Sequence, residues 1–77
     1  MLVGRPRSRL ATVLAVRGLL QQDLVAASGV SRPTVSAAYH DKPGVSLETW
    51  LKLAAALNAR LDEIAPPELA ARVAAVN

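Results

Sequence analysis

The stretch from Gln21 to Tyr39 is interrupted at Gly29, and this interruption constrains the fold more than any other feature of the chain. Its sequence is QQDLVAASGVSRPTVSAAY, in which apolar residues recur at helical spacing before Gly29 and again after Ser31. Glycine accepts the positive φ angle that a tight turn usually requires, and a residue with a side chain does so only at a cost. The stretch therefore predicts two short helices joined by a tight turn.

The composition predicts helices in the rest of the chain as well. The 77 residues are 52% hydrophobic, largely because of alanine, and include one tryptophan, one tyrosine and no phenylalanine. Alanine is the best helix former, whereas sheets are enriched in aromatic and β-branched residues. We therefore expect one small all-α domain. A domain of this size buries only about 60–65% of its unfolded surface, so a partner subunit would stabilise it.

Several classes of protein are excluded or disfavoured by what the sequence lacks. There is no cysteine, which excludes disulfides and thiolate metal sites and favours a reducing compartment. No apolar run approaches the ~20 residues of a membrane span, and no signal-peptide core follows the charged start. We expect a soluble, cytoplasmic protein without a membrane partner.

The positive charge is concentrated in the first half of the chain. The formal net charge is +3, and residues 1–42 contain six basic and two acidic side chains, against three and four in residues 43–77. This asymmetry fits a polyanionic partner such as nucleic acid. A basic surface that only confers solubility would fit it too.

The N-terminal part of the chain predicts a basic arm, residues 1–9, followed by two helices. The first helix begins near Ser8 and ends at Gly18, where a left-handed terminating residue is favoured. The second helix begins near Gln21 and ends at Gly29. The inward residues expected on these helices are Leu10, Val13, Leu14 and Arg17 on the first, and Leu24, Val25 and Ser28 on the second.

The third helix has two possible starting points. Ser31 is a candidate N-cap, with its hydroxyl accepting a hydrogen bond from the amide of Thr34. Proline is well tolerated in a first helical turn, but it biases the preceding residue away from helical geometry. Arg32 is therefore the alternative cap, with Pro33 as the first helical residue.

The C-terminal part predicts a fourth helix, one further turn and a tail helix. Ser46 caps the fourth helix, LETWLKLAAALN, and Asn58 ends it. Its expected core residues are Leu47, Trp50, Leu51, Ala54 and Leu57, and the turn LDEI is expected to bury Leu61 and Ile64. Pro66 and Pro67 precede the tail, residues 66–77, whose apolar stripe comprises Leu69, Val73 and Val76.

Two short helices joined by a tight turn suit DNA recognition. One helix enters the major groove, which is about 12 Å wide, while the other crosses behind it and holds its angle. The third helix fits the first role, because Arg32 to His40 contains small or polar side chains and no acidic residue.

Residues 10–64 resemble the Cro and lambda-repressor type of helix-turn-helix, also called the xenobiotic-response-element family of bacterial and phage regulators. The resemblance rests on QQDL, the turn GVS, SRPTVS and SLETWLKLAAAL in this order and spacing. It implies a lambda-repressor-like DNA-binding domain, a compact bundle of about five short helices, over residues 10–65. Two positions depart from the family pattern. Leu20 replaces a capping serine or threonine, and Val25 replaces an alanine.

The resemblance also implies roles for individual residues. Gln21 matches the family glutamine that binds a phosphate and braces the recognition helix, and Gln22 is expected to reach the same strand. His40 and Lys42 fall in the loop that meets backbone phosphates. The positions that match base-contacting residues are Arg32, Pro33, Thr34, Ser36 and Ala37. Arg32 is the main candidate for specificity, since a guanidinium bonds O6 and N7 of guanine together.

Other candidate roles remain as alternatives. Arg9, with Arg5 and Arg7 of the arm, is expected to contact phosphates or a minor groove, and a disordered arm is the other interpretation. Trp50 is interpreted as a core residue, not as a stacking platform. His40 and Asp41 lack the companions that catalysis or a metal site requires, so we expect no enzyme, no metal and no cofactor.

The sequence therefore predicts a DNA-binding transcriptional regulator of repressor type that recognises a specific duplex sequence. We expect a homodimer joined through Leu69, Val73 and Val76, because two recognition helices read a longer site than one. The alternative is an antitoxin that uses the same fold to bind a toxin-like protein. Single-stranded RNA binding is disfavoured, since it requires exposed aromatic side chains.

Overall fold

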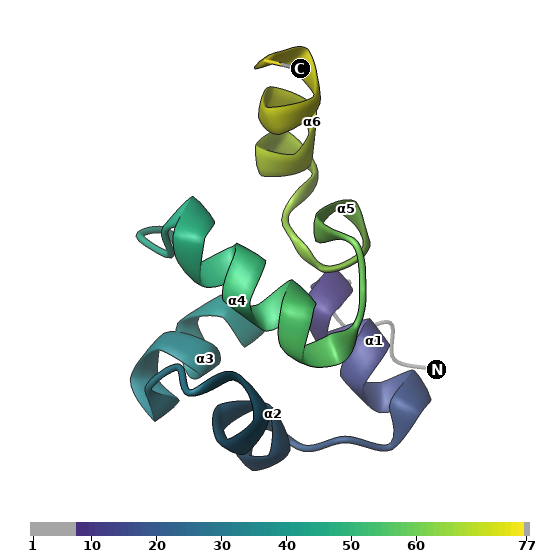
Figure 1. The fold of residues 1–77 in the computed structure, drawn as a ribbon, viewed down its shortest axis with the longest axis vertical. Coiled ribbons are helices and arrows are strands. Elements are labelled where there is room, and N and C mark those ends of the chain that lie inside the picture. The colour runs from purple at the N-terminus through teal and green to yellow at the C-terminus, as the bar shows by residue number, and fades with distance from the viewer. Residues whose placement is uncertain (1–7, 77) are drawn as a thin grey trace, which may run out of the picture.

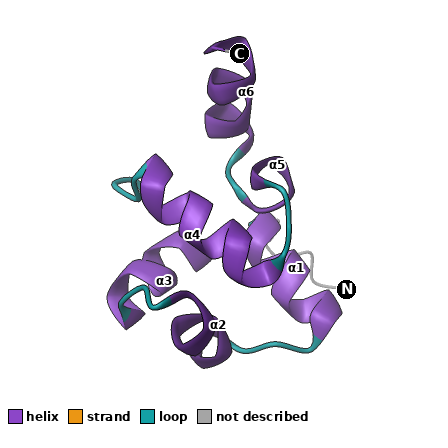
Figure 2. Ribbon diagram, in the orientation of Figure 1, coloured by secondary structure: helices purple, strands orange, loops and turns teal. Residues whose placement is uncertain are grey.

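The chain is all-helical in the computed structural model, which describes residues 8–76, without the side chain of Val76. The expectations for Arg5, Arg7 and the Val76 side chain fall outside what is described. Six helices are present in this range, in agreement with the predicted bundle and tail (Figure 1, Figure 2). They are α1 (Arg9–Arg17), α2 (Gln21–Ser28), α3 (Arg32–Tyr39), α4 (Leu47–Leu57), α5 (Leu61–Ile64) and α6 (Pro67–Val76).

The first five helices enclose one hydrophobic core. Helix α2 packs against α3 and α4, and α1 packs against α5, so that α4 crosses the middle of the bundle (Figure 1). Trp50 is 2% exposed, which confirms it as a core residue. The buried cluster consists of Leu10, Leu14, Leu24, Val35, Ala38, Trp50, Leu53, Ala54, Leu57, Ile64 and Ala65.

The predicted helix ends are confirmed where the sequence supplies a strong signal. Gly18 and Gly29 end α1 and α2 in the left-handed conformation, and Asn58 ends α4 in the same way with φ 52°. Ser8 and Ser46 cap α1 and α4, each accepting a hydrogen bond from the amide three residues later.

The core face of α4 differs from the prediction. Leu47 and Leu51 were expected inside but are 41% and 50% exposed, whereas Leu53 is fully buried. Residues 50, 53, 54 and 57 form the buried stripe, and its spacing is as helical as that of the predicted one. The helix is apolar over much of its circumference, so its packing against α2 and α5 selects the buried face.

Helix α1 and the start of α2 show two further differences. Arg17 was placed on the core stripe but is exposed, and its guanidinium donates a hydrogen bond to the carbonyl of Leu57 at the end of α4. Leu20 has no capping side chain. Asp23 compensates in part, because its carboxylate accepts the Leu20 amide at 2.7 Å.

Helix α6 extends away from the bundle (Figure 1) and contacts α5. Leu69 packs against the edge of the core, and Val73, one turn further on, is partly exposed. The apolar stripe of the tail therefore contacts the bundle at Leu69 and continues beyond the bundle at Val73. Within residues 8–76, no single helix is long and apolar enough to cross a membrane. Helices α1 and α2 have the required length and composition only when they are taken together, and the pair is bent by 97°.

Candidate nucleic-acid interface

The turn between α2 and α3 is held by hydrogen bonds from the end of α2. The amide of Gly29, at φ 74°, donates to the carbonyl of Val25 at 3.0 Å. Ser28 accepts the amide of Val30 at 3.1 Å and donates to the carbonyl of Leu24 at 2.7 Å. Val30 packs against the core. These contacts fix the direction in which α3 leaves the turn.

Two fully buried residues, Val35 and Ala38, anchor α3 to the bundle. Tyr39, the last residue of α3, also packs against the core, and the outer surface of the helix faces away from it. All five residues predicted to contact bases lie on this outer surface: Arg32 and Pro33 are exposed, and Thr34, Ser36 and Ala37 are partly exposed. The helix therefore presents a face of small and polar side chains with one guanidinium at its start.

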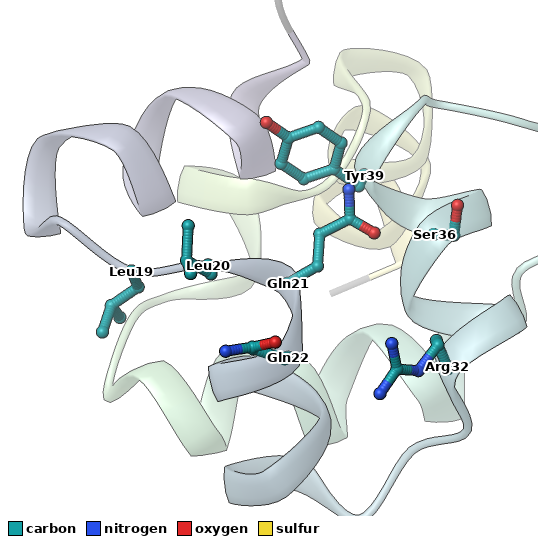
Figure 3. Close-up of a pocket in the computed structure, with 7 residues that line it drawn as sticks. All are labelled: Leu19, Leu20, Gln21, Gln22, Arg32, Ser36 and Tyr39. Atoms are coloured by element: carbon teal, nitrogen blue, oxygen red, sulfur yellow. The ribbon is translucent and has the colours of Figure 1, made fainter.

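The start of α2 and one side of α3 border a shared hollow of about 450 Å³. Arg32, Ser36 and Tyr39 line it from one side of α3, and Gln21 and Gln22 line it from α2 (Figure 3). In Figure 3 the Gln21 amide extends toward Tyr39 and Ser36, and the Arg32 guanidinium points toward α2. The fold thus brings together four of the predicted site residues, Gln21, Gln22, Arg32 and Ser36, from two helices.

The polar groups around this hollow are available to a ligand. Within the described residues, no hydrogen bond or ion pair engages the side chains of Gln21, Gln22 or Arg32. The start of α2 also contributes partial positive charge, because the first amides of a helix lack intrahelical acceptors. Arg32 brings a full positive charge, so the hollow suits an anionic group such as a phosphate.

The end of α3 is closed by four hydrogen bonds to its last four carbonyls. Backbone amides of residues 40, 41 and 42 donate to the carbonyls of Ser36, Ala38 and Ala37, respectively. The fourth carbonyl, that of Tyr39, accepts the hydroxyl of Ser8 at 2.6 Å. This arrangement matches the Schellman motif, with a non-glycine residue, Asp41, in the left-handed position at φ 56°.

His40 and Lys42 donate two of these closing hydrogen bonds through their amides, and both residues are exposed. The rings of Tyr39 and His40 meet edge to face, with centroids 5.1 Å apart. The backbone of Lys42 is fixed by its bond to Ala37 at 2.9 Å. The predicted phosphate contacts therefore fall at both ends of the helical unit, Gln21 and Gln22 at one and His40 and Lys42 at the other.

The start of α3 corrects the sequence analysis in one respect. Ser31 is the N-cap residue and Arg32 is the first helical residue, but the Ser31 hydroxyl accepts no helix amide. It forms a hydrogen bond with the hydroxyl of Thr34 at 2.8 Å instead. The expected hydrogen bond from the Thr34 amide to Ser31 is therefore absent.

Arg9 is separate from the groups described above. Its guanidinium donates to the carbonyl of Asp62 in α5 at 2.8 Å. A guanidinium has five N–H donors, so a phosphate contact by Arg9 would use those that remain.

Sequence reasoning missed two residues of this region. Ser8 was predicted as the start of a helix, but its link to the end of α3 joins positions 31 residues apart, which no local pattern reveals. Leu20, noted only as the residue that replaces a capping serine or threonine, lines the hollow and is 61% exposed. No group of three or more potential metal ligands occurs in the part of the chain that was searched, residues 8–76.

Comparison with known proteins identifies this arrangement. A family model for the Cro/C1-type HTH DNA-binding domain matches residues 9–68. The crystal structure of the restriction-modification controller protein C.AhdI from Aeromonas hydrophila is similar, with a TM-score of 0.65 and 36% sequence identity. The match covers 71% of this chain and 83% of C.AhdI. No curated protein sequence matches the chain.

Proposed function

Because the chain belongs to the family of Cro/C1-type helix-turn-helix DNA-binding domains, we propose that it is a transcriptional regulator that recognises a specific double-stranded DNA sequence. The observation that supports this most directly is the outer face of α3, which carries no acidic side chain and begins with Arg32, whose guanidinium makes no hydrogen bond or ion pair within residues 8–76. The similarity to a restriction-modification controller protein supports a regulatory role. The proposed mode of action is repression by occupation of an operator.

In this proposal α3 lies in the major groove. Arg32 bonds a guanine through O6 and N7, and Thr34 and Ala37 contact neighbouring base edges, including a thymine methyl group. Pro33 and Ser36 complete the base-facing set. The face is compact, so a single copy reads only a few base pairs.

Phosphate contacts fix the orientation of the domain on DNA without reading sequence. Gln21 and Gln22 at the start of α2 are proposed to bind one phosphate region, and His40 and Lys42 the other. Arg9 is the remaining candidate, through the N–H groups that Asp62 does not use. The proposal keeps the predicted division into a basic arm, residues 1–9, a DNA-binding domain, residues 10–65, and a tail, residues 66–77.

A homodimer would present two recognition helices to half-sites about 34 Å apart. The proposed interface is the stripe of Leu69, Val73 and Val76 on α6. Support comes from the direction of α6, which extends beyond the bundle with Val73 partly exposed (Figure 1). Sedimentation of Val73→Asp tests it against Ala71→Asp, a change at an exposed position of the same helix. Only Val73→Asp should dissociate the dimer, and a monomeric wild-type protein would contradict the proposal.

Selection of binding sites from a random duplex library tests the function itself. We expect a two-fold symmetric motif for the wild-type protein. Arg32→Ala should lose about 1–3 kcal/mol of binding free energy and relax one base position in each half-site. Arg60→Ala is the matched control, because the Arg60 side chain is 79% exposed outside the helix-turn-helix face. Weak binding to every duplex alike would instead favour the antitoxin alternative, with a protein as the main partner.

A further inference from the structure

Tyr39, the last residue of α3, borders the hollow between α2 and α3, although none of the DNA contacts proposed above involves it. It lines the hollow together with Gln21 and Gln22 of α2 and Arg32 of α3. In Figure 3 the Tyr39 ring reaches from α3 toward α1, and Gln21 lies between the Tyr39 ring and the Arg32 guanidinium in this view. Tyr39 therefore adds a polar group to the border of the hollow, on the side away from Arg32.

The Tyr39 side chain is held in place by its surroundings. Its ring packs against the hydrophobic core and meets the ring of His40 edge to face, with centroids 5.1 Å apart. Its backbone carbonyl accepts the hydroxyl of Ser8 at 2.6 Å, which ties the end of α3 to the start of α1. Because the ring is already ordered, a ligand that bonds its hydroxyl pays little conformational entropy.

The hydroxyl at the end of this ring is available to a ligand. Within residues 8–76, no hydrogen bond engages the Tyr39 hydroxyl, and no buried side-chain nitrogen or oxygen lacks a partner. The hydroxyl therefore reaches the surface of the described fold, while the residue as a whole is only partly exposed. A hydroxyl without an internal partner rotates freely and can donate to an acceptor from outside.

We propose that Tyr39 is a further phosphate-binding residue, whose hydroxyl donates a hydrogen bond to the DNA phosphate that Gln21 binds at the hollow. The inference rests on the proposed function, in which α3 lies in the major groove and the start of α2 meets the DNA backbone. The Gln21 amide extends toward Tyr39, so donors from the start of α2 and the end of α3 border the same space (Figure 3). A phosphate held from both helices fixes the angle of α3 to the duplex.

The chemistry of this contact differs from that of the basic side chains. A tyrosine hydroxyl donates a hydrogen bond without carrying a positive charge. The salt dependence of DNA binding comes from counterions that are released when Lys or Arg neutralises phosphates. Tyr39 therefore contributes affinity without adding to the salt dependence, in contrast to Lys42. Because phosphates carry no sequence information, its contribution is the same for every duplex.

Tyr39→Phe removes the hydroxyl, keeps the ring and so tests the contact directly. Binding of the wild type and the variant to the selected duplex is titrated at several salt concentrations. We expect Tyr39→Phe to weaken binding about tenfold, as for one hydrogen bond to a charged group, with the same slope of log K against log salt concentration. The selected motif should not change. Tm should stay close to that of the wild type, because no described residue bonds the hydroxyl.

Methylphosphonate substitution locates the contact on the DNA. Replacing one phosphate oxygen by a methyl group removes the charge of that phosphate, and each phosphate of the site is replaced in turn. One replacement should weaken binding by the wild type more than binding by Tyr39→Phe, and the same phosphate should be coupled to Gln21→Ala. Lys42→Ala is the matched control and should be coupled to a different phosphate.

Unchanged binding by Tyr39→Phe would overturn the inference and show that the hydroxyl is only the solvated end of a core residue. A loss of preference at one base position would overturn it too, as would a loss of affinity that is coupled to no phosphate. These results leave the proposed function intact. A wild-type protein that selects no duplex sequence would overturn the proposed function, and this inference with it.

Discussion

The hydroxyl of Ser8 donates a 2.6 Å hydrogen bond to the carbonyl of Tyr39, and so joins the start of α1 to the end of α3. The same oxygen accepts the amide of Ala11 at 3.0 Å as the cap of α1. One side chain therefore satisfies backbone groups at two helix ends, one of which belongs to the proposed recognition helix. A change at this position acts on the bundle and on the orientation of α3 together.

We expect Ser8→Ala to reduce the free energy of unfolding by about 1–2 kcal/mol, because a cap is lost and the Tyr39 carbonyl loses its partner. Urea denaturation monitored by circular dichroism measures this change. Ser8→Thr retains a hydroxyl and should recover most of the loss. Equal stabilities of Ser8→Ala and the wild type would show that the link to Tyr39 contributes nothing.

The two leucines Leu51 and Leu53 on α4 should respond very differently to truncation. Leu53 is fully buried, and Leu53→Ala should cost about 2–5 kcal/mol through lost burial and the cavity left behind. Leu51 is 50% exposed, so Leu51→Ala should cost less than about 1 kcal/mol. Chemical denaturation of both variants tests the buried face of α4, and the reverse order would refute it.

Replacement of Gly29 should show how much free energy of unfolding is lost when a residue with a side chain occupies this position of the turn between α2 and α3. Its φ is +74°, and an added Cβ would have no heavy atom within 4 Å, so the penalty comes from the backbone conformation alone. We expect Gly29→Ala to destabilise the protein by about 1 kcal/mol. Gly29→Asn should cost less, because asparagine tolerates the left-handed region better. The two unfolding midpoints decide this, and a neutral Gly29→Ala would contradict the argument.

Substitution of Lys42 and of Arg17 should distinguish a basic side chain that binds DNA from one that stabilises the fold. Lys42→Ala should weaken binding to all duplexes alike and reduce the slope of log K against log salt concentration by about 1. Arg17 donates to the carbonyl of Leu57, so Arg17→Ala should lower Tm and leave that slope unchanged. Binding titrations at several salt concentrations measure both slopes. A slope that falls only for Arg17→Ala would reverse the assignment.

Local signals in the sequence determined most of the helix boundaries. Gly18, Gly29 and Asn58 end helices in the left-handed conformation, Ser46 caps α4 as predicted, and the predicted start of the first helix near Ser8 is confirmed. These features depend on a residue and its neighbours within one turn, so a single sequence contains the information. The order of QQDL, the glycine turn and SRPTVS similarly predicted the family, which the comparisons confirm.

Tertiary structure decided what depends on contacts between distant residues. Two helical stripes on α4 fit the sequence equally well, and packing against α2 and α5 buried Leu53 in place of Leu51. The bond from Ser8 to Tyr39 spans 31 residues, and the hollow that joins Gln21 to Arg32 needs two helices set against each other. The sequence left the N-cap of α3 open between Ser31 and Arg32; the fold selects Ser31, and its hydrogen-bond partner depends on how the chain leaves the turn. Periodicity identifies apolar and polar faces along a helix, whereas only the packed fold determines which face meets another helix and which remains free to bind.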